Sequence, residues 1–154
     1  MKKKTKAFRK PVRAGTATAA APARVSLRAP AAPSNEARTM ALCAAEAALD
    51  KKASDVEIID VTGKVDYADF LILMTGQSDR HVASIAEGID EALGKRGFNA
   101  ISVEGLPRAQ WVLIDFVDIV VHVFSAETRT FYDIDGLWMD ARRLRMPDAT
   151  PGAM

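Results

Sequence analysis

The sequence predicts an α/β (α+β) fold: a mixed five-stranded sheet with flanking helices. Apolar residues recur at helical spacing in three stretches. Five other stretches have strand character, and the run from Phe70 to Thr75 is apolar on both faces, which is typical of a covered central strand. The resulting order, α-β-β-α-β-β-β-α, indicates one sheet with helices packed against it.

The first helix is predicted from Glu36 to Lys52. Leu42, Ala45 and Leu49 recur at i, i+3 and i+7 among strong helix formers. Cys43 falls inside this helix, and we interpret it as a small core residue, because nothing nearby in the sequence would activate a thiol. The first strand follows over 55–61.

The second strand, over 70–75, leads into the second predicted helix. Ser78 is a suitable N-cap, and Asp79 in the first turn suits the helix dipole. Gly97 is expected to end this helix. One face of the helix carries residues at i, i+3, i+7 and i+11: Val82, Ile85, Ile89 and Leu93.

Three further strands are predicted over 99–103, 110–116 and 118–125. The short break between the last two predicts a tight antiparallel hairpin. Residues 126–131 are expected to form a link with at most one helical turn. A last helix is predicted over 134–146, with apolar residues on one face and three basic residues that suit the dipole of its final turn, namely Arg142, Arg143 and Arg145.

Charge divides the 154-residue chain. Residues 1–37 are rich in Ala and Pro and have a formal charge of +8, whereas residues 38–154 have a formal charge of −7. We expect 1–37 to be disordered, because so few large apolar residues cannot offset the entropy of ordering the backbone. Residues 38–147 are the predicted domain, followed by a short tail over 148–154.

Three interpretations of the basic segment stay open. The first is a solvated extension, with Met40 as an alternative start of the domain. The second is an electrostatic arm that contacts RNA or another polyanion. The third, an organelle transit peptide, is disfavoured by the Lys-Lys-Lys start and the many prolines.

Composition also limits the compartment and the chemistry. A single cysteine fits a reducing compartment, and no apolar run reaches the length of a membrane span, so a cytoplasmic protein that binds no membrane is expected. With only two histidines and no zinc-ligand spacing, phosphate loop or dinucleotide fingerprint, we expect no metal and no cofactor.

One enzymatic alternative uses the predicted turn after the second strand. A magnesium-dependent nucleotidyltransferase would need such a turn, with Gly76 and Ser78, together with a pair of carboxylates, Asp115 and Asp118. These two aspartates lie three residues apart across a turn, not at i and i+2 on one strand face. The structural interpretation is therefore favoured, in which Ser78 caps a helix and the aspartates define the hairpin.

Several motifs resemble the Iojap-related ribosomal silencing factors (RsfS). The matching segments run in order over about 40–140: Lys51 to Asp55, Asp69 to Ile72, Thr75 to Val82, Glu104-Gly105, Trp111 to Asp115, Asp118 to Phe124, Arg129, Phe131 to Asp133 and Leu137-Trp138. The family often has glycine where Val117 stands. The basic segment lies outside the resemblance, and under the interpretation as an electrostatic arm its expected partner is ribosomal RNA.

The resemblance implies a non-catalytic regulator, with a fold similar to that of nucleotidyltransferases but without their catalytic carboxylate set. Family members bind the large ribosomal subunit through its ribosomal protein fourteen, which blocks joining of the small subunit and represses translation when nutrients are scarce. Members are often homodimers. No enzymatic activity is therefore expected.

On this basis we predict a protein-binding surface on the acidic domain, whose charge suits a basic ribosomal protein. Trp111 is the expected apolar anchor. Arg80 and Arg129 are expected either to pair with the carboxylates or to orient the surface, and an internal Asp118–His122 pair is the alternative for those two residues. The full predicted surface is Glu104, Trp111, Asp115, Asp118, His122, Tyr132, Arg80 and Arg129.

Overall fold

The computed structural model describes residues 32–106 and 108–145. Their helices and strands follow one another along the chain with short connections. In order they are α4 (Asn35–Asp50), β1 (Ser54–Asp60), β2 (Phe70–Gly76), α5 (Asp79–Gly94), β3 (Ser102–Glu104), β4 (Trp111–Asp115), β5 (Ile119–Ser125), α6 (Ala126–Tyr132), α7 (Ile134–Leu137) and β6 (Arg142–Leu144). The predicted α/β class is confirmed.

The strands form one mixed sheet in the order β3-β4-β5-β2-β1-β6. Only β2 and β5 are parallel, and every other neighbouring pair is antiparallel. All seven residues of β2 are buried, which confirms the covered central strand. The sheet has six strands where five were predicted, because β6 adds a strand at the β1 edge.

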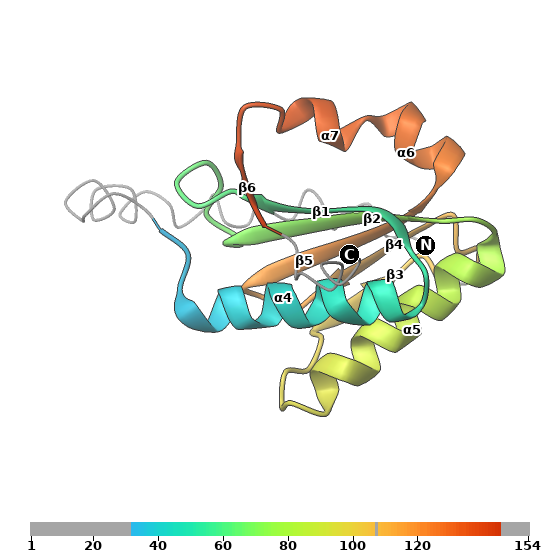
Figure 1. Ribbon diagram of the computed structural model, residues 1–154, viewed down its shortest axis with the longest axis horizontal. Coiled ribbons are helices and arrows are strands. Elements are labelled where there is room, and N and C mark those ends of the chain that lie inside the picture. The colour runs from blue at the N-terminus through green and yellow to red at the C-terminus, as the bar shows by residue number, and fades with distance from the viewer. Residues whose placement is uncertain (1–31, 107, 146–154) are drawn as a thin grey trace, which may run out of the picture.

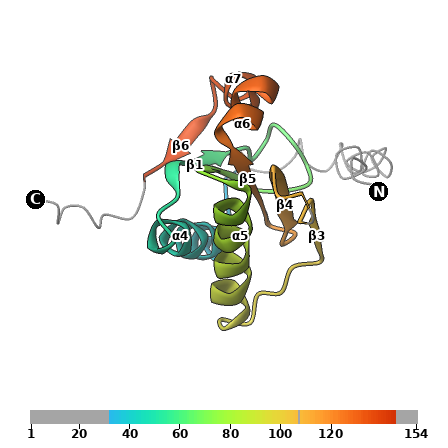
Figure 2. The ribbon, with the colours of Figure 1, turned by 90° about the vertical axis from the view of Figure 1, so that its right-hand side faces the viewer.

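One face of the sheet, the α4–α5 face, is covered by those two helices (Figures 1 and 2). The predicted apolar stripe of α5 is confirmed, since all four of its residues are fully buried: Val82, Ile85, Ile89 and Leu93. Ser78 caps this helix as predicted, because its Oγ accepts a hydrogen bond from the His81 backbone N–H at 3.0 Å.

Helix α4 packs through its alanines. Ala41, Ala44 and Ala48 are fully buried, whereas Leu49 is 38% exposed. Leu49, the last residue of the apolar repeat in the sequence, is therefore not part of the core. Side chains that end at Cβ let α4 lie close to α5 and the sheet, so small size decides which side of this helix faces inward. Cys43 is buried, as predicted, and burial raises the pKa of its thiol.

The other face of the sheet, the α6–α7 face, is covered by the shorter helices (Figure 2). Its buried side chains form a second, smaller core: Ile59, Val61, Ala68, Leu71, Leu73, Val120, Phe124 and Ala141. Trp138 packs against this core.

The predicted last helix over 134–146 is wrong. Residues 126–132 form the seven-residue helix α6 instead of a link, α7 is only four residues long, and Arg142–Leu144 form β6. The three arginines therefore do not neutralise a helix dipole. Pairing with the free edge of β1 supplies backbone hydrogen bonds that outweigh a modest helical pattern.

The start of the domain also differs from the expected boundary. Ser34 is the N-cap of α4, with its Oγ 2.9 Å from the Ala37 backbone N–H, so residues 35–37 are helical. The expectation of disorder for 1–37 thus fails for 35–37, and most of that segment, 1–31, lies outside the described residues. The predicted tail over 148–154 also lies outside them.

Candidate functional site

Strands β4 and β5 bring four ring or apolar side chains together on the α6–α7 face. Trp111 lies opposite Phe124, and Leu113 lies opposite His122. On β4 the side chains alternate between half-buried and buried, and the half-buried ones point to this face. Helices α6 and α7 therefore leave part of the sheet above β4 accessible.

The predicted site residues Trp111 and His122 hydrogen-bond to each other. The Trp111 Nε1–H donates to His122 Nδ1 at 3.1 Å. Indole can only donate, so Nδ1 must be an acceptor and the imidazole is neutral, with its proton on Nε2. His122 is only 7% exposed, and burial lowers its pKa from 6.5 to about 4. His122 consequently supports Trp111 from below and offers little surface to a partner.

From Trp111 a cluster of aromatic rings extends outward to solvent. The Trp111 ring stacks on Phe124 with 5.1 Å between centroids and contacts Tyr132 at 4.7 Å. Tyr132 in turn meets Phe131 edge to face at 4.9 Å. Exposure rises along this aromatic cluster, from 0% at Phe124 to 52% at Tyr132 and 78% at Phe131. Its outer end is an accessible apolar surface on a firmly packed base.

A pocket of about 680 Å³ lies beside the aromatic cluster. One wall is the loop after β3, where Gly105 has φ of +93° and a Cβ would lie 2.1 Å from the Trp111 carbonyl oxygen. Only glycine fits there, so this loop can approach β4 closely. The lining residues are Gly105, Arg108, Gln110, Trp111, Glu127, Thr128, Phe131 and Tyr132.

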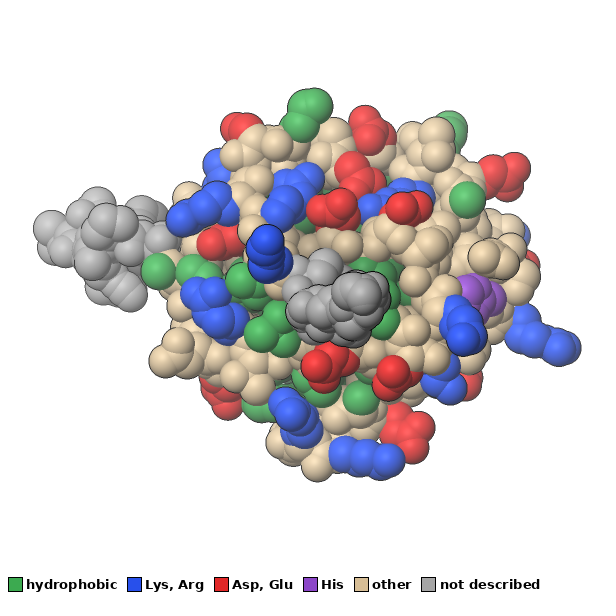
Figure 3. Space-filling view, viewed as in Figure 1, with side chains coloured by type: hydrophobic (Ala, Val, Ile, Leu, Met, Phe, Trp, Pro, Cys, Tyr) green, Lys and Arg blue, Asp and Glu red, His purple; other side chains and the backbone are tan. Residues whose placement is uncertain are grey.

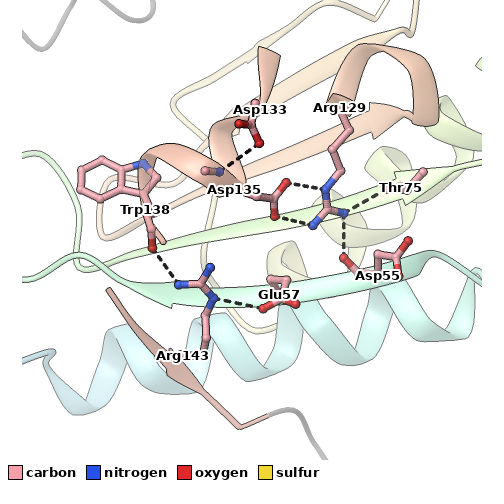
Figure 4. A network of polar contacts seen from close by, with 9 residues as sticks. Asp55, Glu57, Thr75, Arg129, Asp133, Asp135, Trp138 and Arg143 are labelled. Atoms are coloured by element: carbon pink, nitrogen blue, oxygen red, sulfur yellow. Dashed lines mark hydrogen bonds and ion pairs between the residues drawn. The ribbon is translucent and has the colours of Figure 1, made fainter. Parts of the chain in front are cut away.

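Arg129 fastens α6 and α7 to the sheet (Figure 4). Its guanidinium donates to both carboxylate oxygens of Asp135, with Nε at 2.9 Å and Nη2 at 2.8 Å. Its Nη1 donates to the Asp55 carbonyl at 2.7 Å and to Thr75 Oγ1 at 2.9 Å. The hydrogen bond from Arg129 lowers the pKa of Asp135. Arg129 therefore holds α6 on the sheet, and it pairs with none of the predicted carboxylates.

A second arginine fixes the other end of the same segment. Arg143 on β6 pairs with Glu57 at 3.1 Å and donates to the carbonyls of Trp138 and Ala141 at 2.9 and 3.0 Å. Figure 4 shows both arginines reaching between the sheet and α7. Together they hold the segment that carries Phe131 and Tyr132 in one position on the sheet.

The structure separates the predicted site residues into two groups. Trp111, His122 and Tyr132 lie together, and Glu104 adjoins Gly105 at the pocket. Asp115 and Asp118 lie at the other end of β4 and β5. Asp118 is four residues from His122 along β5, about 13 Å in an extended strand, so the alternative of an internal pair is wrong.

At that far end the two aspartates shape the hairpin. Asp115 Oδ1 accepts from the Val117 backbone N–H at 2.8 Å, as the structural interpretation predicted. The pKa of Asp118 is raised, by burial first and then by the nearby charges of Asp69 and Glu36. Arg80 is exposed in the first turn of α5, on the other side of the sheet.

The geometry also separates the residues of the enzymatic alternative. Gly76 ends β2 opposite Ser125, whereas Asp118 precedes Ile119, which lies opposite Phe70 at the start of β2. The full length of these strands, about 20 Å, lies between the turn and the aspartates. Within 32–106 and 108–145, no group of three or more His, Cys, Asp or Glu side chains is arranged to hold a metal ion.

Sequence reasoning missed several exposed apolar residues of α6, α7 and the turn that follows α7. Phe131, Leu137 and Met139 are 78%, 67% and 72% exposed. The signal for two of them was present, because Phe131 and Leu137 lie in the motifs that carry the family resemblance. In the part of the chain described, no helix is long and apolar enough to cross a membrane.

Comparison with known proteins gives consistent matches. The family model described as "Ribosomal silencing factor during starvation" matches residues 34–153. Ribosomal silencing factor RsfS of Bacillus subtilis is 39% identical over 98 residues, which are 64% of this chain and 83% of that protein. The chloroplastic protein Iojap of Zea mays is 28% identical over 112 residues, covering 73% of this chain and 49% of that protein.

Solved structures agree with these matches. A crystal structure of a protein from Chromobacterium violaceum superposes with a TM-score of 0.65 at 30% identity, over 75% of this chain and 97% of that one. A crystal structure from Bacillus halodurans gives a TM-score of 0.62 at 31% identity, over 73% of this chain and 100% of that one.

Proposed function

The chain belongs to the family of ribosomal silencing factors, and from this premise we propose that it is a non-catalytic repressor of translation. In this proposal it binds the large ribosomal subunit in the cytoplasm and blocks joining of the small subunit. Its direct partner there is ribosomal protein fourteen, and its activity follows nutrient limitation. The mechanism is steric, so it requires only affinity and correct placement on the subunit.

The observation that carries the proposal is the outer end of the aromatic cluster beside the pocket. Binding sites for proteins are typically built from aromatic anchors on a rigid base. Phe131 and Tyr132 are the exposed anchors, and Trp111 with His122 is the base. Two arginines hold this segment in place, so little conformational entropy would be lost on binding.

Charge supports a basic protein as the partner. Residues 38–154 have a formal charge of −7, and opposite potentials accelerate and orient association. Glu104 directly precedes Gly105, which lines the pocket. Of the acidic residues in the predicted surface, it is the one nearest in sequence to a pocket-lining residue. We therefore propose Glu104, Trp111, Phe131 and Tyr132 as the docking surface, with His122 and Arg129 in supporting positions and Asp115, Asp118 and Arg80 outside it.

The test is co-sedimentation of the full-length chain with separated ribosomal subunits. Phe131→Ala removes an exposed ring, so folding should be preserved while binding to the large subunit weakens. A hot-spot loss of about 2 kcal/mol corresponds to roughly a thirtyfold rise in Kd. Trp111→Ala is a poorer probe, because Trp111 also packs on Phe124 inside the fold.

Ile101→Ala is the matched control, because Ile101 is 64% exposed but lies beside Asp115, at the end of the sheet away from the pocket. It should bind as the unchanged chain does. Equal binding of both variants would refute the docking surface, and no enrichment on the large subunit would refute the function.

The family resemblance also supports self-association, and we propose that the free protein forms a homodimer. Light scattering on a dilution series measures this directly. A mass near 16.6 kDa at all concentrations would contradict it.

A further inference from the structure

The pocket beside the aromatic cluster has a carboxylate on one wall. Glu127 and Phe131 both line it and lie four residues apart on α6, so their side chains are neighbours on the same side of the helix. Glu127 is exposed and, among the described residues, makes no ion pair within 4 Å. Its charge is therefore available to a partner directly beside an exposed ring.

Two arginines bear on the charge of this pocket. Arg129 is held by both carboxylate oxygens of Asp135. Arg108 lines the pocket from the loop between β3 and β4, is exposed, and has no ion pair within the part of the chain that the structure describes. It opposes a cation at this site, whereas Glu104 at the end of β3 favours one. Removing the charge of Glu127 or of Arg108 should therefore affect a charged ligand in opposite directions.

Other polar groups of the lining are bonded inside the domain or carry no charge. Thr128 Oγ1 accepts from Ser125 Oγ at 2.8 Å, and the Trp111 indole N–H donates to His122. Gln110 adds a neutral amide. The carboxylate on α6 is therefore the strongest hydrogen-bond acceptor among the residues that line the pocket.

An arginine side chain matches this lining. Its guanidinium is planar, so it can stack on an aromatic ring and donate paired hydrogen bonds to a carboxylate at the same time. Phe131 and Tyr132 are 78% and 52% exposed, so their rings are accessible. The ammonium group of lysine is a point charge without this planar match, and Glu127 repels an anionic ligand.

Charge is distributed differently over the face of the domain in Figure 3. There Lys and Arg side chains are interspersed with Asp and Glu side chains. A cation of a partner would meet attraction and repulsion together on that face. At the pocket, by contrast, an available carboxylate adjoins exposed rings, which favours this place for a cationic side chain.

We infer that the pocket receives an arginine side chain of the partner protein, with the guanidinium on the Phe131 ring and its N–H groups donating to the Glu127 carboxylate. The inference rests on the proposed function and deepens it, because a basic ribosomal protein supplies such side chains. An arginine held in a pocket beside the docking surface also fixes the orientation of the partner.

The first test uses the full-length chain and a blocked pentapeptide, Gly-Gly-Arg-Gly-Gly, followed through the NMR signal of the Trp111 indole N–H. The same peptide with citrulline in place of arginine has nearly the same shape but no charge. The arginine peptide should bind roughly fivefold more tightly, which is the scale of one accessible charge pair. Glu127→Gln should abolish this preference, and Arg108→Gln should increase it. If the unchanged chain does not distinguish the two peptides, the inference is wrong.

Co-sedimentation with the large ribosomal subunit separates the inference from the proposed function. Glu127→Gln should weaken binding roughly fivefold, whereas Arg108→Gln should strengthen it. Glu87→Gln is the matched control, because Glu87 is an exposed glutamate on α5, on the other face of the sheet, and its substitution changes the net charge equally. It should bind as the unchanged chain does.

The outcomes distinguish the two failures. If Phe131→Ala weakens subunit binding but Glu127→Gln does not, the docking surface stands and the inference is wrong. Equal weakening by Glu127→Gln and Glu87→Gln would show that net charge alone matters, and would overturn it too. If the chain distinguishes the peptides but does not enrich on the large subunit, the proposed function fails while the preference of the pocket for arginine stands.

Discussion

Arg129→Ala should loosen the packing of α6 and α7 on the sheet and so destabilise the whole domain. The Arg129 side chain is 11% exposed, and its guanidinium makes four hydrogen bonds, two of them to the Asp135 carboxylate. The substitution removes the Arg129 donor from Thr75 Oγ1, and Thr75 is only 8% exposed. It also leaves the negative charge of the Asp135 carboxylate without its cationic partner. Breaking such a partly buried pair costs about 3 kcal/mol, which lowers the Tm of a domain this size by roughly 10 °C.

Urea denaturation followed by tryptophan fluorescence measures this loss, because Trp111 and Trp138 both lie on the affected face. Arg129→Lys keeps the charge but cannot reach the four acceptors, so it should recover less than half of the stability. Lys95→Ala removes a fully solvated pair with Glu91 and should change little. If Arg129→Ala and Lys95→Ala are equally stable, Arg129 does not hold the segment as described.

Two further predictions concern strain and protonation. Val117 is a β-branched residue at φ of +77°, so Val117→Gly should stabilise the protein by about 0.5–1 kcal/mol, net of the greater unfolded-state entropy of glycine. The control Val103→Gly, in β3, should destabilise the protein. Thermal melts in which both variants shift Tm in the same direction would contradict this prediction. The pKa of His122 is lowered from 6.5 to about 4 by burial in the folded protein, so as the pH is lowered the unfolded chain binds a proton before the folded one does. About 3 kcal/mol of the free energy of unfolding should therefore be lost as the pH falls from 6.5 to 4. His122→Gln, whose side-chain oxygen can still accept from Trp111, should lose that dependence, and unchanged pH curves would show that His122 does not titrate in this range.

The C-terminal third shows where sequence reasoning failed. Leu137, Ala141 and Leu144 recur at helical spacing, yet Ala141 ends on the second core and Leu144 packs on the first from β6. A periodic pattern records which residues are apolar, but it does not show that the edge of β1, far away in the sequence, is available to pair with this segment. In the same way, nothing local in the sequence indicated that Arg129 would reach Asp55, 74 residues earlier.

The predicted binding surface illustrates the same limit. Trp111, Tyr132 and His122 were identified from motifs, and the structure does bring them together. Asp115 and Asp118 were grouped with them because an acidic surface suits a basic ribosomal protein, but strand direction places them at the other end of the sheet. The alternation of side chains along a strand indicates which face of the sheet a residue occupies, whereas its position along the strand decides which residues it contacts.

The sequence by itself determined the fold class, the central strand, the apolar stripe of α5 and the family, because each is recorded in local periodicity or in ordered motifs. Tertiary structure alone decided the sixth strand, the arginine attachments of α6 and α7, the neutral state of His122 and the outward course of the aromatic cluster. Each of these depends on contacts between residues distant in the chain or on burial from water. Those quantities exist only once the sheet has assembled.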